Sequence, residues 1–300
     1  MTITTAPVPD TVHERDFHRL ARSTPRHRWW RPLAVVALAG VLFLAGTMLA
    51  IVPMAVVEVA VPGQDGLVDR LFGPAGMSDP LVATVMLTTI ALMLPAALLA
   101  VRLAGGRGAG TLSSVTGRLR RVLLVRCVGL GLLLVVPALL AFVTLDGTWQ
   151  DLAVSGTTAP LLAVALLVVP LQAAAEEYAF RGLLMQTIGA WLRHPAFAIV
   201  LPVPLFTLGH EYDLLGLLDV TVFALTAGWL AWRTGGLEAP IGIHVANNAA
   251  LVAFGAVGLV DLDATEGTWF GLACSVGVTL GYAWLVRGWG DADATSRPRP

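Results

Sequence analysis

Residues 159–182 read APLLAVALLVVPLQAAAEEYAFRG, which joins a long apolar run to three charged side chains. The run is long enough to cross a bilayer as a helix, since such a helix needs roughly 20 mostly apolar residues. Glu176, Glu177 and Arg181 follow near its end. Because charged groups are costly inside a membrane, these three side chains are a functional hypothesis by default.

The composition of the whole chain supports a membrane protein. Of its 300 residues, 56% are hydrophobic and only 13% are charged, whereas about a quarter of the residues of a soluble domain are charged. We therefore expect a surface that faces the lipid bilayer. No basic patch with interleaved aromatic residues suggests nucleic acid as a partner. Cys127 and Cys274 each lie in an apolar run, and we interpret them as packing residues.

Eight apolar stretches predict an all-α fold, a polytopic membrane helix bundle of about eight transmembrane helices. They run near 33–57, 81–103, 122–144, 159–180, 196–212, 215–232, 238–258 and 268–287. The fifth and sixth stretches are short and are separated only by HEYDLLG.

Arginine residues predict the orientation of the bundle, because short cytosolic loops carry an excess of positive charge. The N-terminal arm, the second loop, the turns after the fourth and sixth stretches and the C-terminal tail are basic. The first, third and seventh loops are acidic. This alternation places both termini in the cytosol. A composition rich in alanine and arginine and poor in lysine points weakly to a bacterial cell membrane.

Helix geometry separates the two adjacent glutamates. Residues four apart share a face, whereas neighbours lie about 100° apart. Glu177 can therefore pair with Arg181, while Glu176 points elsewhere and is free to face a cavity. The same spacing of four recurs in FTLGH, residues 206–210, and in HVANN, residues 244–248.

The depths of these groups agree only under one condition. Glu176 and His210 each lie on the order of 25 Å from the turn at 193–195, at 1.5 Å per residue, so an antiparallel hairpin brings them to one level. His244 lies about 12–15 Å from its own cytosolic turn by the same rise. The hairpin must therefore project beyond the membrane into the cytosol. Otherwise His210 lies too near the outer face and the site fails.

These residue types suit the hydrolysis of an amide. A carboxylate beside an imidazole can activate water, directly or through a metal, and a His–Asn pair can donate hydrogen bonds to an oxyanion. Structural interpretations stay open for each group taken alone. The Glu–Arg pair can simply neutralise itself, a histidine can be a packing residue, and asparagine often joins membrane helices.

The three motifs resemble those of a known family. EEYAFR, FTLGH and HVANN match EExxxR, FxxxH and HxxxN, in this order, of the CPBP intramembrane proteases, also called the CAAX protease and bacteriocin-processing or Abi family. The resemblance covers roughly residues 155–260 and implies a conical intramembrane catalytic cavity. We divide the chain into a cytosolic basic arm, N-terminal transmembrane helices, the catalytic core, a last transmembrane helix and a disordered tail, over residues 1–31, 32–150, 151–260, 261–287 and 288–300.

The resemblance implies roles for seven residues. Glu176 would activate the attacking water, and His210 would bind or orient it. His244 and Asn248 would stabilise the oxyanion. The remaining three would support the site or pack beside its cavity: Glu177, Arg181 and Phe206.

The cofactor and the substrate stay open at this point. Members of the family are classed as metalloproteases, and a zinc site of Glu176, His210 and His244 is compatible with the resemblance. However, the chain lacks HExxH, the motif that places two zinc-binding histidines on one helix. A membrane peptide or protein is the expected substrate, and whether it is prenylated stays undecided.

Three functions compete. The leading one is an intramembrane endopeptidase of metallo type that cleaves near the cytosolic side. The alternative is a catalytically silent family member that acts as a membrane scaffold or as an immunity or regulatory protein. A transporter is the third, since Glu and His also form proton relays, but the paired repeats typical of transporters are not evident. We interpret three further acids as loop or interface residues: Glu211, Asp213 and Asp219.

Overall fold

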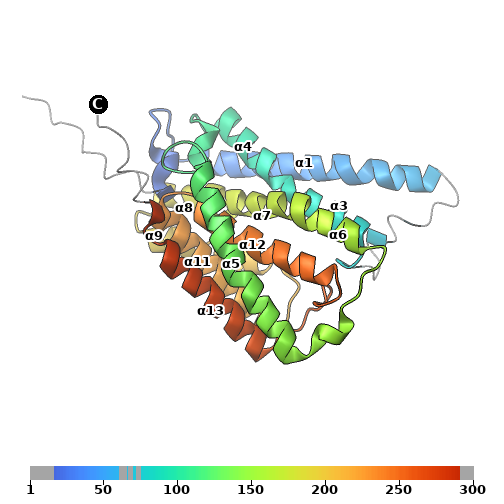
Figure 1. Cartoon of the computed structure of the whole chain (residues 1–300). Helices are drawn as coiled ribbons and strands as arrows, with labels where there is room; N and C mark the ends of the chain where they lie inside the picture. The colour runs from blue at the N-terminus through green and yellow to red at the C-terminus, as the bar shows by residue number, and fades with distance from the viewer. Residues whose placement is uncertain (1–16, 61–65, 67–69, 72–75, 291–300) are drawn as a thin grey trace, which may run out of the picture.

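The computed structural model describes residues 17–60, 66, 70–71 and 76–290, and these residues fold almost entirely into helices (Figure 1). The described part contains no strand beyond one isolated β-bridge between Ser114 and Gly236. The prediction of an all-α membrane bundle is confirmed.

The chain begins with a short 3-10 helix, η1 (Phe17–Arg22). The α-helices are α1 (Arg31–Ala60), α3 (Pro80–Ala91), α4 (Met93–Ala104), α5 (Arg121–Asp146), α6 (Thr158–Ala163), α7 (Val169–Glu177), α8 (Met185–Trp191), α9 (Pro195–Val200), α10 (Val203–Thr207), α11 (Leu214–Thr234), α12 (Glu238–Gly255) and α13 (Trp269–Val286). Two π-helical segments, η4 (Val164–Val168) and η5 (Tyr178–Leu184), join α6, α7 and α8 into one long helix. Two further 3-10 turns are η2 (Ala109–Leu112) and η3 (Thr148–Asp151).

Six helices among the described residues are long and apolar enough to cross a membrane. They span Arg31–Val56, Pro80–Ala104, Arg121–Asp146, Thr158–Trp191, Leu214–Thr234 and Trp269–Val286. The fifth predicted stretch forms only the short apolar helix Pro195–Thr207, which contains Pro202 and Pro204. Each of these prolines removes a helix hydrogen bond and favours a break.

The seventh predicted stretch is α12, which differs from the six spanning helices. It packs against α5, α7 and α11, and its residues from Glu238 to Ala246 are all buried. The helix carries a glutamate, a histidine and two asparagines, which lower its mean hydropathy. Because its neighbours cover it, this polar helix does not have to face lipid.

Small residues let α5 and α12 approach closely. A Cβ added at Gly131 of α5 would lie 2.7 Å from Ala246 Cβ, and one added at Gly242 of α12 would lie 2.5 Å from Cys127 Cβ. Close approach through glycine and alanine is a common way for membrane helices to pack, because the backbones gain van der Waals contact. The contact holds the helix that carries HVANN.

Both described ends of the chain lie at one end of the bundle (Figure 1), and the loops at this end contain most of the arginines. At this end α12 begins with a buried ion pair, in which Arg120 Nη2 lies 2.7 Å from Glu238 Oε2. The N-terminal arm is partly folded here, because Phe17, His18 and Leu20 are buried and η1 packs on α8. The rest of the arm and the tail from residue 291 lie outside the described residues.

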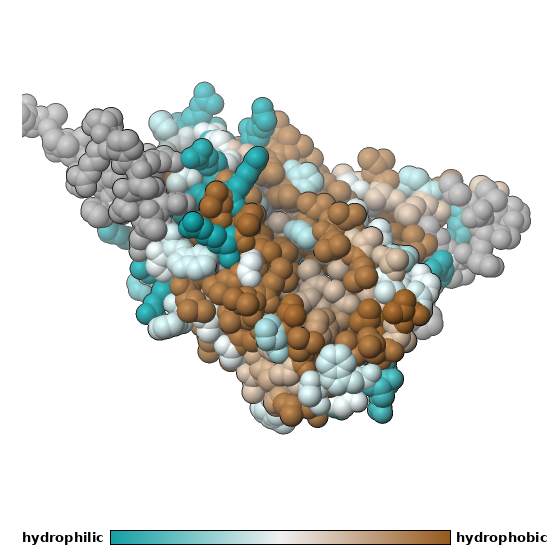
Figure 2. Space-filling view, in the orientation of Figure 1, coloured by the Kyte–Doolittle hydropathy of each residue, from teal (hydrophilic) through white to brown (hydrophobic). Residues whose placement is uncertain are grey.

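The flanks of the bundle are apolar, as a lipid-facing surface requires. Figure 2 shows hydrophobic residues over most of one face, with hydrophilic residues gathered toward the ends. On α1, for example, Val41, Leu44 and Leu49 are exposed. The protein is therefore an integral membrane protein.

Candidate functional site

The first motif lies where the long helix Thr158–Trp191 changes from α to π geometry. Glu176 and Glu177 end α7, and Arg181 lies within η5. A π segment adds a residue to one helical turn and often marks a functional site. Both acids are buried, with 9% of Glu176 and 0% of Glu177 exposed.

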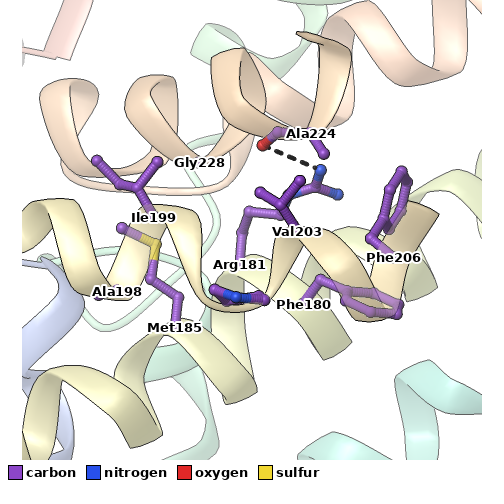
Figure 3. Close-up of a pocket in the computed structure, with 10 residues that line it drawn as sticks. Phe180, Arg181, Met185, Ala198, Ile199, Val203, Phe206, Ala224 and Gly228 are labelled. Carbon is purple, nitrogen blue, oxygen red and sulfur yellow. Dashed lines mark hydrogen bonds between the residues drawn. The ribbon is translucent and has the colours of Figure 1, made fainter. Parts of the chain in front are cut away.

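Glu177 and Arg181 form the predicted ion pair. Arg181 Nη1 donates to Glu177 Oε1 at 2.9 Å. Its other terminal nitrogen donates to the carbonyl oxygen of Ala224 at 3.3 Å (Figure 3). The guanidinium also lies over the ring of Phe206, 4.3 Å from its centroid, and 5.6 Å from that of Phe223, which adds a cation–π attraction.

A small space beside Arg181 is too narrow for a substrate. It measures about 10 Å³ and lies between η5, α9, α10 and α11, with Met185, Ile199 and Val203 on its walls (Figure 3). A volume of roughly 10–15 Å³ holds at most one water molecule. The substrate must therefore bind elsewhere.

His244 lies between the two adjacent glutamates. Its Nδ1 donates to Glu177 Oε1 at 2.8 Å, and its Nε2 lies 3.4 Å from Glu176 Oε2. An ionised carboxylate only accepts hydrogen bonds, so Nδ1 carries a proton. Within the described part of the chain, Glu176 Oε2 makes no hydrogen bond of its own. The two acids thus have different partners, although one histidine contacts both.

The register of α7 and α12 adds a residue that the sequence reasoning missed. Asn248 Nδ2 donates to Gln172 Oε1 at 3.4 Å, and Asn247 Nδ2 donates to Asn248 Oδ1 at 3.1 Å. Gln172 lies one turn before Glu176, and Asn248 lies one turn after His244. The antiparallel helices α7 and α12 therefore form two polar contacts, Glu176–His244 and Gln172–Asn248. The spacing of four between Gln172 and Glu176 was the available signal.

His210 follows α10 and is oriented by its own motif. Its Nδ1 donates to the carbonyl oxygen of Phe206 at 2.9 Å. Because a carbonyl only accepts, the Nε2 of the neutral ring keeps its lone pair. The Phe206 ring lies 5.0 Å from the ring of His210 and 6.4 Å from that of His244. Phe206 thus contacts both imidazoles.

A cavity of about 390 Å³ lies between α5, α11, α12, α13 and the loop that joins the last two helices. Its walls include His210, His244 and Asn248, with Phe206 beside them. Glu176 is not among the lining residues, and it reaches the cavity through its contact with His244. Glu177 and Arg181 lie behind His244. The second and third motifs therefore meet at one space.

The three residues considered for zinc do not gather into a metal site. In the described ranges, no group of three or more His, Cys, Asp or Glu side chains is placed to hold a metal ion. Glu176 contacts His244. The ring of Phe206 contacts both His210 and His244, with ring centroids 5.0 and 6.4 Å apart. The arrangement of Glu176, His210 and His244 does not fit a three-ligand metal site, so the proposed reaction uses the side chains alone.

The structure corrects the interpretation of Asp219 as a loop or interface acid. Asp219 lies within α11, and its side chain lines the cavity. Glu266, in the loop before α13, lines the same cavity. Tyr212 stacks on His210 with ring centroids 6.0 Å apart. Burial, and then the nearby carboxylates of Asp219 and Glu176, raise the pKa of Tyr212. One acid in a mostly apolar helix was the signal in the sequence.

Comparison with known proteins identifies a family that matches the segment carrying the motifs. Residues 158–250 match the family described as type II CAAX prenyl endopeptidase Rce1-like. This segment contains all three motifs, and the match confirms the predicted family resemblance.

One relative of the chain is itself described only as an uncharacterized protein. The uncharacterized protein YyaK of Bacillus subtilis (strain 168) is 33% identical over 101 residues. The match covers 31% of this chain and 34% of YyaK, so it spans about a third of that relative's length. No solved structure matches the chain.

Proposed function

We propose that the protein is an intramembrane endopeptidase that hydrolyses a peptide bond of a membrane-associated substrate. The observation that carries this proposal is the 390 Å³ cavity, which His210, His244 and Asn248 line together. The contact between His244 and Glu176 adds a carboxylate beside it. The match of residues 158–250 to an endopeptidase family supports the same reaction.

The proton between Glu176 and His244 is central to the proposal. A carboxylate oxygen and the bare nitrogen of a neutral imidazole both accept hydrogen bonds, so their 3.4 Å contact calls for one proton between them. With this proton on His244, the two negative and two positive groups of the network balance. The network consists of Glu176, Glu177, Arg181 and His244. A balanced network is less costly to bury in a membrane.

In the proposed reaction, a water molecule in the cavity attacks the carbonyl carbon of the scissile bond. His210 Nε2 accepts a hydrogen bond from this water and orients it, while Glu176, whose side chain is 11% exposed beside His244, takes the proton. Once Glu176 is protonated, it attracts the Nε2–H of His244 less strongly, and this N–H, with an N–H of Asn248, stabilises the oxyanion. The C–N bond then breaks, and the proton on Glu176 passes to the leaving amine.

Other residues of the site position these groups. Glu177 accepts the Nδ1–H of His244 and so fixes which nitrogen faces Glu176. Arg181 holds Glu177 in place. Gln172 holds the amide of Asn248 and leaves its second N–H for the substrate.

The position of the cavity suggests the side from which a substrate enters. Its walls include Thr265, Glu266 and Gly267, which lie beyond the C-terminal end of α12, whereas Arg120 lies at the opposite end of this helix. With the arginine-rich end in the cytosol, the substrate reaches the site from the other side. This differs from the expectation of cleavage near the cytosolic side.

The test compares purified variants in lipid nanodiscs with a membrane-inserted peptide library whose products are identified by mass spectrometry. We expect Glu176→Gln to lower kcat by at least about 100-fold, since general acid–base groups contribute that much or more. His210→Ala should also lose most of the activity. Glu211→Gln is the matched control, because Glu211 is exposed and does not line the cavity.

Wild-type cleavage rates in a folded Glu176→Gln protein would contradict the proposal. A host phenotype that the same variant fully restores would instead favour a scaffold or regulatory role.

A further inference from the structure

The cavity has a marked charge asymmetry. Its lining includes two carboxylates, Asp219 and Glu266, and among the described residues that line it there is no lysine or arginine. Among the residues that the structure describes, the basic side chains on its walls are the two histidines of the proposed active site. The cavity therefore presents net negative charge to whatever enters it.

Asp219 lies close to the proposed reaction centre. Gly216, Asp219, Val220 and Phe223 all line the cavity, and their spacing places them on one face of α11. The Phe223 ring lies 4.9 Å from the ring of His244. Asp219 is one turn away from Phe223, which is about 6 Å along the helix axis.

Asp219 is half-buried, and its partners differ from those of the two acids that are 0% exposed, Glu177 and Glu238. Glu177 and Glu238 each form an ion pair with an arginine. The side chain of Ser275 on α13 lies near Asp219, and the described residues provide no ion-pair partner for it. An acid within a membrane segment is costly without a cation. The cavity that Asp219 lines offers a route by which a cation can reach it.

We propose that Asp219 is a specificity-determining residue that binds a lysine or arginine side chain of the substrate. An extended peptide advances about 3.3–3.6 Å per residue, so the basic residue would lie about two residues from the scissile bond. Glu266 is exposed near the loop and adds negative charge along the entry route.

Much of the cavity wall away from Asp219 is apolar. Val135, Leu139 and Phe142 of α5 face the same space, with Leu251 of α12 and Val278 of α13. Apolar walls with the carboxylate of Asp219 near the reaction centre suit an apolar segment that carries one basic residue. The inference rests on the proposed function, because it assigns a substrate class to the same cavity.

The experiment uses peptides that are identical except for Lys, Gln or Glu at one position, which is moved along an apolar membrane segment. Cleavage by the full chain in nanodiscs is measured as kcat/KM for each peptide. We expect Lys two or three residues from the cleaved bond to be preferred over Gln by about tenfold, as for a hydrogen bond to a charged group. Asp219→Asn should abolish this preference while the Gln peptide is still cleaved.

Two further variants sharpen the test. Asp219→Lys should reverse the preference toward Glu. Asp213→Asn is the matched control, because Asp213 caps the same helix by accepting from the N–H of Gly216 and does not line the cavity. It should retain the preference of the wild-type protein. Binding of the Lys and Gln peptides to Glu176→Gln protein gives the same comparison without turnover.

The outcomes separate the two proposals. Cleavage without any charge preference, or a Lys preference that Asp219→Asn leaves intact, would overturn the role of Asp219 and leave the endopeptidase standing. No cleavage by the wild-type protein, together with tighter binding of the Lys peptide that depends on Asp219, would overturn the endopeptidase and support the binding site.

Discussion

The neighbouring residues Glu176 and Glu177 have different partners because a helix turns by about 100° per residue. Glu177 is fully buried and accepts from both Arg181 and His244. Glu176 contacts only the far nitrogen of the same histidine. Removing one partner of a buried ion pair leaves a charge without compensation, which costs much more than the pair contributes.

Arg181→Met should therefore destabilise the protein strongly. We expect a loss of about 3–5 kcal/mol in the free energy of unfolding, measured by denaturation in a mild detergent. Arg70→Met is the control, because Arg70 pairs with Asp79 at the surface and its side chain is 45% exposed. Its loss should stay below about 1 kcal/mol. Equal losses for the two variants would contradict the structural role of Arg181.

At the scale of elements, the closeness of α5 and α12 sets the position of His244 and Asn248. Glycine at 131 and 242 lets the two helices meet with almost no space between them. The same two helices form adjacent walls of the cavity. Any side chain added in the contact must push α12 away from α5 and shift the third motif relative to α7.

Gly131→Ala should lower both stability and activity. The added Cβ would lie 2.7 Å from Ala246 Cβ, and overpacking of this kind costs about 1–3 kcal/mol. Gly129→Ala, on the same helix, is the matched control, because a Cβ at this position meets no atom within 4 Å. It should be neutral or slightly stabilising, since alanine favours helix over glycine by up to about 1 kcal/mol. Thermal melting and peptide cleavage test both variants, and an unaffected Gly131→Ala protein would rule out this tight contact.

At the scale of the whole molecule, the bundle has one arginine-rich end and one cavity that reaches toward the other end. The two cysteines differ in whether they face the cavity. Cys274 lines the cavity, whereas Cys127 is 0% exposed between α5 and α12. Thiols that meet water react with soluble reagents, and buried ones do not.

A water-soluble maleimide should modify Cys274 in the folded protein and Cys127 only after unfolding. Mass spectrometry of the labelled protein distinguishes the two sites. In sealed vesicles, an impermeant maleimide should reach Cys274 from the side opposite the arginine-rich loops. Labelling from the arginine-rich side would place the cavity opening at the other face of the membrane.

Much of the site was predictable from local patterns. The spacing of four predicted the Glu177–Arg181 pair, and the three motifs predicted a family that residues 158–250 match. Gln172, Phe223 and Asp219 were missed, because each belongs to the site through a contact with another helix. The catalytic roles of Glu176, His210, His244 and Asn248 stay predictions until the variants are measured.

Composition and apolar runs were sufficient to predict an all-α membrane protein, since a bilayer demands long apolar helices whatever their arrangement. Spacing within one helix was sufficient for the ion pair, since a helix has a constant turn. The cavity, and the position of His244 between two acids, depended on how antiparallel helices align and how closely glycine lets them pack. These distances arise between segments far apart in the chain, so no local pattern contains them.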